Sequence, residues 1–435
     1  MLSARPVRGR FRSLRWGADT ILIVILLAIP WIHIGGSPLI LLDVPARKFH
    51  VFGLTIFPQE LYFLWLIVAA MAFALFFFTA LAGRLWCGWA CPQTVFTDLY
   101  AGVARRIQGW TRGGPPRRIA VWRKVATHVV WIALSGFVGF HLVAYFRSPY
   151  ELLGALAKAD LGGASMRFWL AGTALAYVDF ALVRQVFCKY LCPYARFQSV
   201  LFDRETLLVA YDERRGEPRG KRGTVDGDCV DCGMCVEVCP TEIDIRHGLQ
   251  LECIACTQCI DACNEVMARV GRAPDLISYR SLDGLEGGRG ARAWRPRVLV
   301  YGAMLVVLAA VFTGAVAARK PMAMMVEHNR ASLYQKTADG RIGNAFTLHL
   351  QNRARTDRVF RLQLEPESDY ELVTGLNPLP IPAITTLEAR VFVVARNGVQ
   401  PSREVTFVLE EVENPDRRIE RSSRFMLPGG GGGGR

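Results

Sequence analysis

Five long apolar stretches constrain the fold more than any other feature of this 435-residue sequence. They cover, in chain order, residues 19–36, 61–83, 125–146, 168–187 and 297–317. A helix needs about 20 apolar residues to cross the hydrocarbon core of a bilayer, so the sequence predicts a five-helix transmembrane bundle. No signal-peptide pattern with a small-residue cleavage site accompanies the first stretch, which is therefore expected to remain as an anchor.

Basic residues between these stretches predict how the helices are oriented. Residues 1–16 hold five arginines and no acidic residue, and loop 84–124 holds eight basic residues. Loops 37–60 and 147–167 hold only two and three. By the positive-inside rule, we expect a multi-pass protein of the bacterial inner membrane with a cytoplasmic N-terminus and a periplasmic C-terminus. The net charge of +14 is explained in this way, and no nucleic-acid partner is expected.

A short cysteine motif follows the second and the fourth apolar stretch. It is CGWACP at residues 87–92 and CKYLCP at residues 188–193, and both copies lie on the predicted cytoplasmic side. An outgoing helix, a returning helix and a Cys-x3-Cys-Pro ending thus occur twice, which indicates an internal repeat. Cysteines four residues apart at a helix start project to one face. The two copies are therefore expected to form one four-thiol pocket from Cys87, Cys91, Cys188 and Cys192.

Eight further cysteines crowd into residues 229–263. They form two runs of Cys-x2-Cys-x2-Cys-x3-Cys, the spacing of a two-cluster bacterial ferredoxin, in which the fourth cysteine of each run binds the other cluster. The first [4Fe–4S] cluster is assigned to Cys229, Cys232, Cys235 and Cys263, and the second to Cys253, Cys256, Cys259 and Cys239. A pair of zinc sites is the alternative, but eight cysteines in this register favour clusters. Pro240 follows the first run, whereas Asn264 stands in the corresponding place after the second.

The C-terminal part of the chain has a different character. Residues 344–352, 358–365, 387–396 and 403–412 alternate apolar and polar side chains, and turn formers separate them. Short strands at this spacing predict an all-β, immunoglobulin-like sandwich. The glycine-rich tail 429–435 is expected to be disordered.

These features predict a multi-domain membrane protein with five parts. They are a basic tail with four transmembrane helices (1–187), a cytoplasmic region with an α+β ferredoxin insert (188–296), a fifth helix (297–317), a periplasmic sandwich (318–428) and the tail (429–435).

A few isolated residues leave two interpretations open. Asp179 lies within the fourth apolar stretch, where an acid is either functional or bonded to a neighbouring helix. His33 and His141 lie near outer helix ends, where they would ligate haem or copper, contact a quinone, or serve only as interfacial side chains. The segment 322–328 offers Met322, Met324, Met325 and His328, which suit Cu(I) or are simply flexible interfacial residues.

Taken together, the motifs and their order resemble the CcoG (FixG/RdxA) family of accessory proteins of cbb3-type cytochrome oxidase. The resemblance covers nearly the whole chain and implies a membrane reductase of Cu(II) to Cu(I). Copper would be the substrate, and the thiols of Cys87, Cys91, Cys188 and Cys192 would bind and reduce it. The implied partners are copper ions, copper-transport and oxidase assembly proteins, cbb3-type oxidase subunits and an electron donor that the sequence does not name. Soft thiolates favour Cu(I) over Cu(II), which agrees with this role.

Other functions fit the same residues. One alternative is a quinol-oxidising subunit of a periplasmic reductase system, because related helix pairs with Cys-x3-Cys-Pro endings occur in such systems. Another is an assembly scaffold that senses redox state. As alternatives to copper reduction, the four membrane-edge cysteines (Cys87, Cys91, Cys188 and Cys192) would hold a third cluster or act as small buried thiols.

Overall fold

The computed structural model describes residues 4–111, 114–158, 163–220, 226–288, 290–329, 333–396 and 404–427, without the side chains of residues 199 and 200. The predicted disordered tail 429–435 lies outside the described residues. The chain divides into two compact units, Met1–Phe312 and Thr313–Arg435, and each is described by itself.

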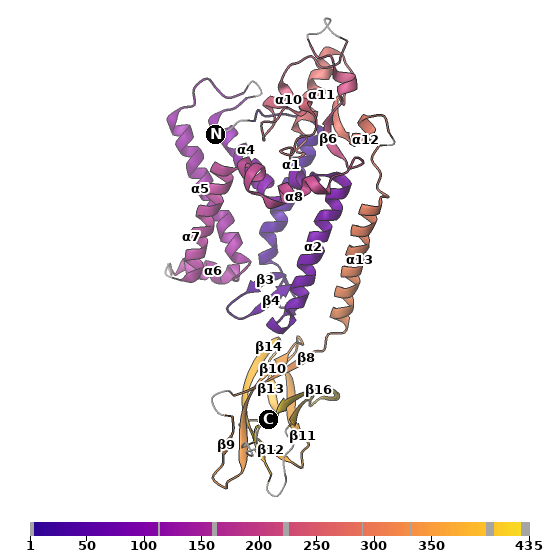
Figure 1. The fold of residues 1–435 in the computed structure, drawn as a ribbon. Helices are drawn as coiled ribbons and strands as arrows, with labels where there is room; N and C mark the ends of the chain where they lie inside the picture. The colour runs from indigo at the N-terminus through magenta and orange to yellow at the C-terminus, as the bar shows by residue number, and fades with distance from the viewer. Residues whose placement is uncertain are drawn as a thin grey trace, which may run out of the picture. The chain divides into compact units, whose positions relative to one another are not determined.

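Five helices in the described part are long and apolar enough to cross a membrane, as the sequence predicts (Figure 1). They are α1 (Arg10–Ala28, extended by η1, Ile29–Trp31), α2 (Leu61–Ala82, after η2, Pro58–Glu60), α5 (Val121–Ala144), α7 (Ala164–Tyr177, extended by the π-helix η3, Val178–Val183) and α13 (Pro296–Ala317).

Two of the predicted helix boundaries are wrong. The first helix begins at Arg10, before the apolar stretch, because its basic first turns are held by acidic partners, and residues 33–34 belong to a strand. The fourth ends at Val183 because Arg184 has φ +55°, a left-handed backbone that interrupts a helix.

Shorter elements complete the first unit. Between α1 and α2 lie the small sheets β1–β2 (His33–Ile34, Ser37–Pro38) and β3–β4–β5 (Ile40–Asp43, Lys48–Val51, Leu54–Ile56). The connecting helices are α3 (Leu85–Trp89), α4 (Pro92–Gln108), α6 (Pro149–Ala157), η4 (Phe187–Leu191) and α8 (Pro193–Leu201). The ferredoxin insert contains β6 (Leu208–Tyr211), α9 (Glu213–Gly216), α10 (Met234–Glu237), η5 (Ile245–His247), α11 (Gln258–Val270), β7 (Ile277–Arg280) and α12 (Leu282–Leu285).

One buried carboxylate joins two helices of the membrane unit. Asp98 on α4 accepts a hydrogen bond from Arg12 and forms ion pairs with Arg15 at 3.4 Å and Arg105 at 3.5 Å. Burial would raise the pKa of Asp98, but the charges of Arg15 and Arg12 outweigh it and hold the pKa below its usual range. Asp98 is therefore a charged centre to which the start of α1 is bound.

The start of α1 is bound to the ferredoxin insert as well. The carboxylate of Asp261 on α11 accepts the backbone N–H groups of Phe11 at 3.2 Å and Arg12 at 2.7 Å. These are N–H groups of the first helical turn, which have no partner within the helix. Through Asp98 and Asp261, α1 connects α4 to the helix that carries two predicted cluster ligands.

The second unit is the predicted immunoglobulin-like sandwich. One antiparallel sheet has the order β12–β14–β10–β8, with β9 paired to β10, and the other has the order β13–β11–β15–β16. The strands are β8 (Met322–His328), β9 (Gln335–Lys336), β10 (Ile342–Asn352), β11 (Arg358–Glu365), β12 (Tyr370–Val373), β13 (Leu379–Ile381), β14 (Thr385–Ala395), β15 (Glu404–Glu411) and β16 (Asn414–Arg424). Alternating side chains such as Phe346, Phe360 and Phe407 fill the core between the sheets.

The Asp98 cluster generates a stability prediction. Replacing Asp98 by Ala leaves three buried or half-buried arginines without their shared counter-charge, so the unfolding free energy should fall by about 3–5 kcal/mol. A thermal melt of the detergent-solubilised protein measures this loss. The matched control is Glu151→Ala, which removes the exposed Arg147–Glu151 pair and should cost only about 0.5 kcal/mol. Equal effects of the two changes would contradict the structural role of Asp98.

Candidate electron-transfer site

The two predicted cluster-binding loops have the same backbone shape. Asp231 and Ala255, each two residues after the first cysteine of a run, have φ +52° and +53°. Gly233 and Thr257, two residues further on, have φ +68° and +63°. Left-handed residues between right-handed ones turn successive N–H groups toward one side, a geometry that binds anions such as iron–sulfur clusters. Both loops are therefore shaped for a cluster.

The structure brings the eight ferredoxin cysteines into the two predicted groups. Cys229, Cys232, Cys235 and Cys263 line one cavity. Burial, followed by the charges of the three other members, raises the pKa of Cys263 to about 12. In the second group, burial and then the charges of Cys256, Cys253 and Cys239, together with that of Cys235 from the first group, raise the pKa of Cys259 well above its usual range. Such thiols ionise only when a cation binds them, which an iron cluster provides.

A single-ion site does not compete with this interpretation. Across the described ranges, no three His, Cys, Asp or Glu side chains lie close enough together to chelate one metal ion, and this holds for the eight ferredoxin cysteines and for Cys87, Cys91, Cys188 and Cys192 alike. Thiolates of a cubane cluster each bind a different iron atom, so they stand farther apart than the ligands of one zinc ion. The donor set therefore fits two [4Fe–4S] clusters, which supply one-electron transfer when bound.

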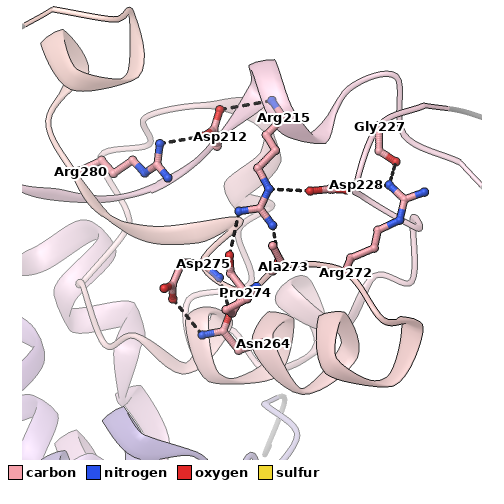
Figure 2. A network of polar contacts seen from close by, with 10 residues as sticks. All are labelled: Asp212, Arg215, Gly227, Asp228, Asn264, Arg272, Ala273, Pro274, Asp275 and Arg280. Atoms are coloured by element: carbon pink, nitrogen blue, oxygen red, sulfur yellow. Dashed lines mark hydrogen bonds and ion pairs between the residues drawn. The ribbon is translucent and has the colours of Figure 1, made fainter.

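Asn264 stands after the last cysteine of the second run, where a proline is usual, and its side chain forms two hydrogen bonds with Asp275 (Figure 2). Its amide Nδ2 donates to Asp275 Oδ1 at 3.1 Å, and its Oδ1 accepts the backbone N–H of Asp275 at 2.8 Å. Next to it, Asp228 accepts hydrogen bonds from Arg215 at 2.5 Å and Arg272 at 2.9 Å. The contacts of Asp228 hold the chain immediately before Cys229, and those of Asn264 hold the chain immediately after Cys263 to Asp275.

The two Cys-x3-Cys-Pro motifs also share one local geometry. Four residues before the first cysteine, the helix is interrupted at Gly83 (φ +55°, ψ −120°) and at Arg184 (φ +55°, ψ −127°). The N–H of the second cysteine bonds to the carbonyl five residues earlier, from Cys91 to Trp86 at 2.9 Å and from Cys192 to Phe187 at 2.8 Å. A proline then starts α4 and α8 at the favoured first helical position. The predicted repeat thus has a structural counterpart.

These turns bring the four membrane-edge thiols near one another. Burial, then the charges of Cys91, Cys87 and Cys192, raises the pKa of Cys188 to about 12. Burial, then the charge of Cys91, raises the pKa of Cys87 to about 12 as well. The buried side chain of Gln198 on α8 lies 3.6 Å from the Cys87 sulfur. Without a bound cation, the thiols of Cys87 and Cys188 are protonated at neutral pH.

The four-thiol pocket lies directly against the loop of the second cluster. A Cβ atom on Gly88, between Cys87 and Cys91, would stand 2.5 Å from the carbonyl oxygen of Ala255 and 2.7 Å from that of Ile254. Only glycine permits this approach of α3 to the cluster loop. The indole of Trp89 donates to the Tyr279 hydroxyl at 3.1 Å, which in turn donates to the Ala255 carbonyl at 3.5 Å.

A buried arginine lies between the same two groups. Arg84 donates to the carbonyl oxygen of Ala195 at 2.6 Å. Its charge acts on both Cys87 and Cys253, which belong to the four-thiol pocket and the second cluster group. The two sites therefore share one electrostatic environment.

The isolated residues have structural partners. Asp179 accepts a hydrogen bond from Gln93 Nε2 at 3.0 Å, which favours the interpretation as a helix-to-helix contact. The ring of His141 contacts the Phe137 carbonyl through Nδ1 at 2.9 Å and accepts from the Trp31 indole through Nε2 at 3.3 Å, so both nitrogens are engaged. His33 contacts the Trp31 carbonyl at 3.3 Å.

The methionine segment does not form a copper site in this structure. It is strand β8, in which side chains alternate between the faces, and Met322 and Met324 lie in the sandwich core. Met325 points the other way, and His328 bonds to Asn344 at 3.0 Å. Met325 therefore lies on the opposite face of the strand from Met322 and Met324.

Several site residues escape sequence reasoning. Gln198 belongs to no motif, whereas Gly88 lies within the first cysteine motif, and the roles of both depend on segments far away in the chain. Asp98 is one acid in an amphipathic helix, and nothing local distinguishes it. The glycine between two cysteines was the only available signal, because glycine often marks a close approach of two backbones.

Membrane-spanning helices, two cluster-binding cysteine groups and a neighbouring thiol pocket define the class: an iron–sulfur electron-transfer protein of the membrane. Family comparisons agree. A 4Fe-4S dicluster domain matches residues 183–282, a 4Fe-4S binding domain matches residues 63–111, and the "IG-like fold at C-terminal of FixG, putative oxidoreductase" matches residues 312–428.

Whole-chain relatives give the family. Protein RdxA of Cereibacter sphaeroides is 36% identical over 428 residues, covering 92% of this chain and 90% of the relative. Nitrogen fixation protein FixG of Rhizobium meliloti is 31% identical over 493 residues, covering 98% and 93%. The ferredoxin-type protein NapH of Escherichia coli is 27% identical over 187 residues, covering 38% and 62%. The chain belongs to the FixG/RdxA family, and the predicted fold class and family are confirmed.

Proposed function

We propose that this protein reduces Cu(II) to Cu(I) at the pocket of Cys87, Cys91, Cys188 and Cys192, as a step in copper delivery to cbb3-type cytochrome oxidase. The observation that carries the proposal is the contact between Gly88 and the loop of the second cluster, which sets the thiols beside an electron source. Thiolate ligands favour Cu(I), so they make the gain of one electron by bound Cu(II) easier.

The chemistry proposed for the pocket balances with one electron per copper ion. Cu(II) displaces protons from the thiols that bind it, and these protons leave to water. It then gains one electron through the ferredoxin insert and becomes Cu(I), which stays on the soft sulfur ligands until a recipient takes it. The proposed recipients are copper-transport and oxidase assembly proteins or oxidase subunits, and this part rests on the family resemblance.

A second candidate uses the same four thiols for a third cluster. It is favoured by the match of a 4Fe-4S binding domain to residues 63–111, which include Cys87 and Cys91. A quinol-oxidising subunit of a reductase system is a further alternative, and the partial similarity to NapH supports it. The C-terminal FixG-type domain favours the assembly role over that alternative.

We also propose that the N-terminus and the ferredoxin insert lie in the cytoplasm and the C-terminal unit in the periplasm. The support is the excess of arginine in residues 1–16 and in loop 84–124. A reporter fused after residue 280 should be active only as a cytoplasmic reporter, and one fused after residue 427 only as a periplasmic reporter. The same location for both would refute this topology.

Changing all four membrane-edge cysteines to serine separates the two candidate functions. Iron content should stay at about eight atoms per chain, because the ferredoxin ligands are untouched. Cu(II) reduction, measured with a Cu(I)-specific chelator and dithionite-reduced protein, should fall to background. A loss of about four irons would instead assign the pocket to a third cluster. Full activity of the variant would rule out both roles.

The Gly88 contact gives a finer test of electron transfer. Gly88→Val must push α3 away from the carbonyls of Ile254 and Ala255, so copper reduction should slow about tenfold or more while all four thiols remain. The matched control is Gly136→Val on α5, where an added Cβ meets nothing within 4 Å. Iron content confirms that both variants keep their clusters. An unchanged rate in Gly88→Val would show that electrons do not pass through this contact.

A further inference from the structure

A cavity of about 670 Å³ lies between α1, α4 and the start of α11. This volume is typical of small-molecule sites. The cavity wall on α1 is a single helix face with residues three or four positions apart, comprising Arg12, Trp16, Asp19, Thr20, Ile23 and Val24. The wall on α4 has the same spacing and includes Val95, Asp98, Leu99, Gly102 and Val103.

The polarity of the cavity changes along α1. Ile23 and Val24 form its apolar end within the membrane span, and Arg8 and Arg12 lie at the other end. From Arg12 to Ile23 the helix rises about 17 Å. Val24 and Trp16 are more than half exposed, so the cavity opens on the surface that faces lipid. A ligand that fits has an apolar tail in the bilayer and a polar head at the membrane surface.

Asp19 indicates the chemistry of that head. Its side chain is 93% buried, lines the cavity, and has an Oδ1 atom without a hydrogen-bond partner in the structure. A buried acceptor of this kind requires a donor. A hydroxyl group supplies one, whereas a lipid phosphate offers no donor to Asp19 and would bind instead to the lining arginines Arg8, Arg12, Arg105 and Arg106. Neither Arg12 nor Arg15 donates a hydrogen bond to Asp19 Oδ1, and the buried Nε and Nη1 atoms of Arg15 also lack partners in the described residues.

The polar head would lie next to the ligands of the second cluster. Gln258 lines the cavity, its backbone N–H bonds to the Cys256 sulfur, and Cys259 follows it in the chain. Arg15, which pairs with Asp98 at 3.4 Å, also acts electrostatically on Cys256. A positive charge there favours addition of an electron to the cluster that Cys256 binds.

We propose that this cavity binds a membrane quinol, which is the electron donor of the protein. Oxidation breaks the two O–H bonds of the quinol and releases a quinone, two electrons and two protons. The two electrons need two one-electron acceptors, which the clusters held by the eight ferredoxin cysteines would supply. One proton passes to the Asp19 carboxylate and the other to water at the arginine-lined end. This inference does not depend on whether the four-thiol pocket reduces copper.

Gly102 is a position at which a substitution can fill the cavity and so test whether it binds a quinol. It lines the cavity, and an added Cβ there meets nothing within 4 Å, so Gly102→Phe fills the cavity from within a helix. Gly314→Phe on α13 is the matched control, because its Cβ also meets nothing within 4 Å and it does not line the cavity. Asp19→Asn keeps the volume and removes the negative charge. Iron content and full reduction by dithionite verify that each variant is intact.

Two measurements without copper decide the proposal. Anaerobic decylubiquinol should reduce the clusters of the unaltered protein, followed by electron paramagnetic resonance. The rate should fall about tenfold or more in Gly102→Phe and about tenfold in Asp19→Asn, and stay unchanged in Gly314→Phe. An azido-quinone should photolabel peptides of α1 and α4, and Gly102→Phe should abolish that labelling.

Several results would overturn the assignment. They are no reduction by the quinol in the unaltered protein, an unchanged rate in both cavity variants, or labelling outside α1 and α4. Retention of phosphatidylglycerol in native mass spectra, lost in Gly102→Phe without any quinol labelling, would make the cavity a lipid site instead. If quinol reduces the clusters but copper reduction fails, the copper proposal alone falls.

Discussion

The buried ion cluster around Asp98 is the interaction on which the membrane unit depends. Three arginines enter a region of low polarity only because one carboxylate neutralises part of their charge. Two of them come from α1, whose first turn is also held by Asp261 of the ferredoxin insert. Arg12, Asp98 and Arg105 of this cluster also line the cavity beside α1.

The repeated turn explains why the chain uses half of a ferredoxin motif twice. A left-handed residue interrupts the incoming helix, a wide turn follows, and a proline starts the next helix, in both copies. Gly83 adopts this conformation without strain, whereas Arg184 adopts it at a cost of about 1–3 kcal/mol. Gln93, which follows the first motif, donates to the carbonyl of Arg184 at 3.1 Å and so couples the two turns.

Much of this architecture was predictable because its causes are local in the sequence. The spans follow from runs of apolar residues, the cluster groups from cysteine spacing, and the sandwich from alternation in β10, β11, β14 and β15. The boundaries at Arg10 and Val183 were not, because distant acids and an unusual φ set them. The roles of Asp98, Gly88 and Gln198 also escaped, since their partners lie far away in the chain, and of the three only Gly88 lies within a motif.

The bonds from Phe11 and Arg12 to Asp261 have a consequence for biosynthesis. The ribosome makes the first helix about 250 residues before the helix that receives its N–H groups. Four of the five long apolar helices are therefore made while the start of α1 lacks its final partner. Arg5 pairs with Glu237 at 2.7 Å, so this ion pair also forms only after most of the membrane helices have been made. These contacts of α1 can therefore form only after the ferredoxin insert has been made and folded.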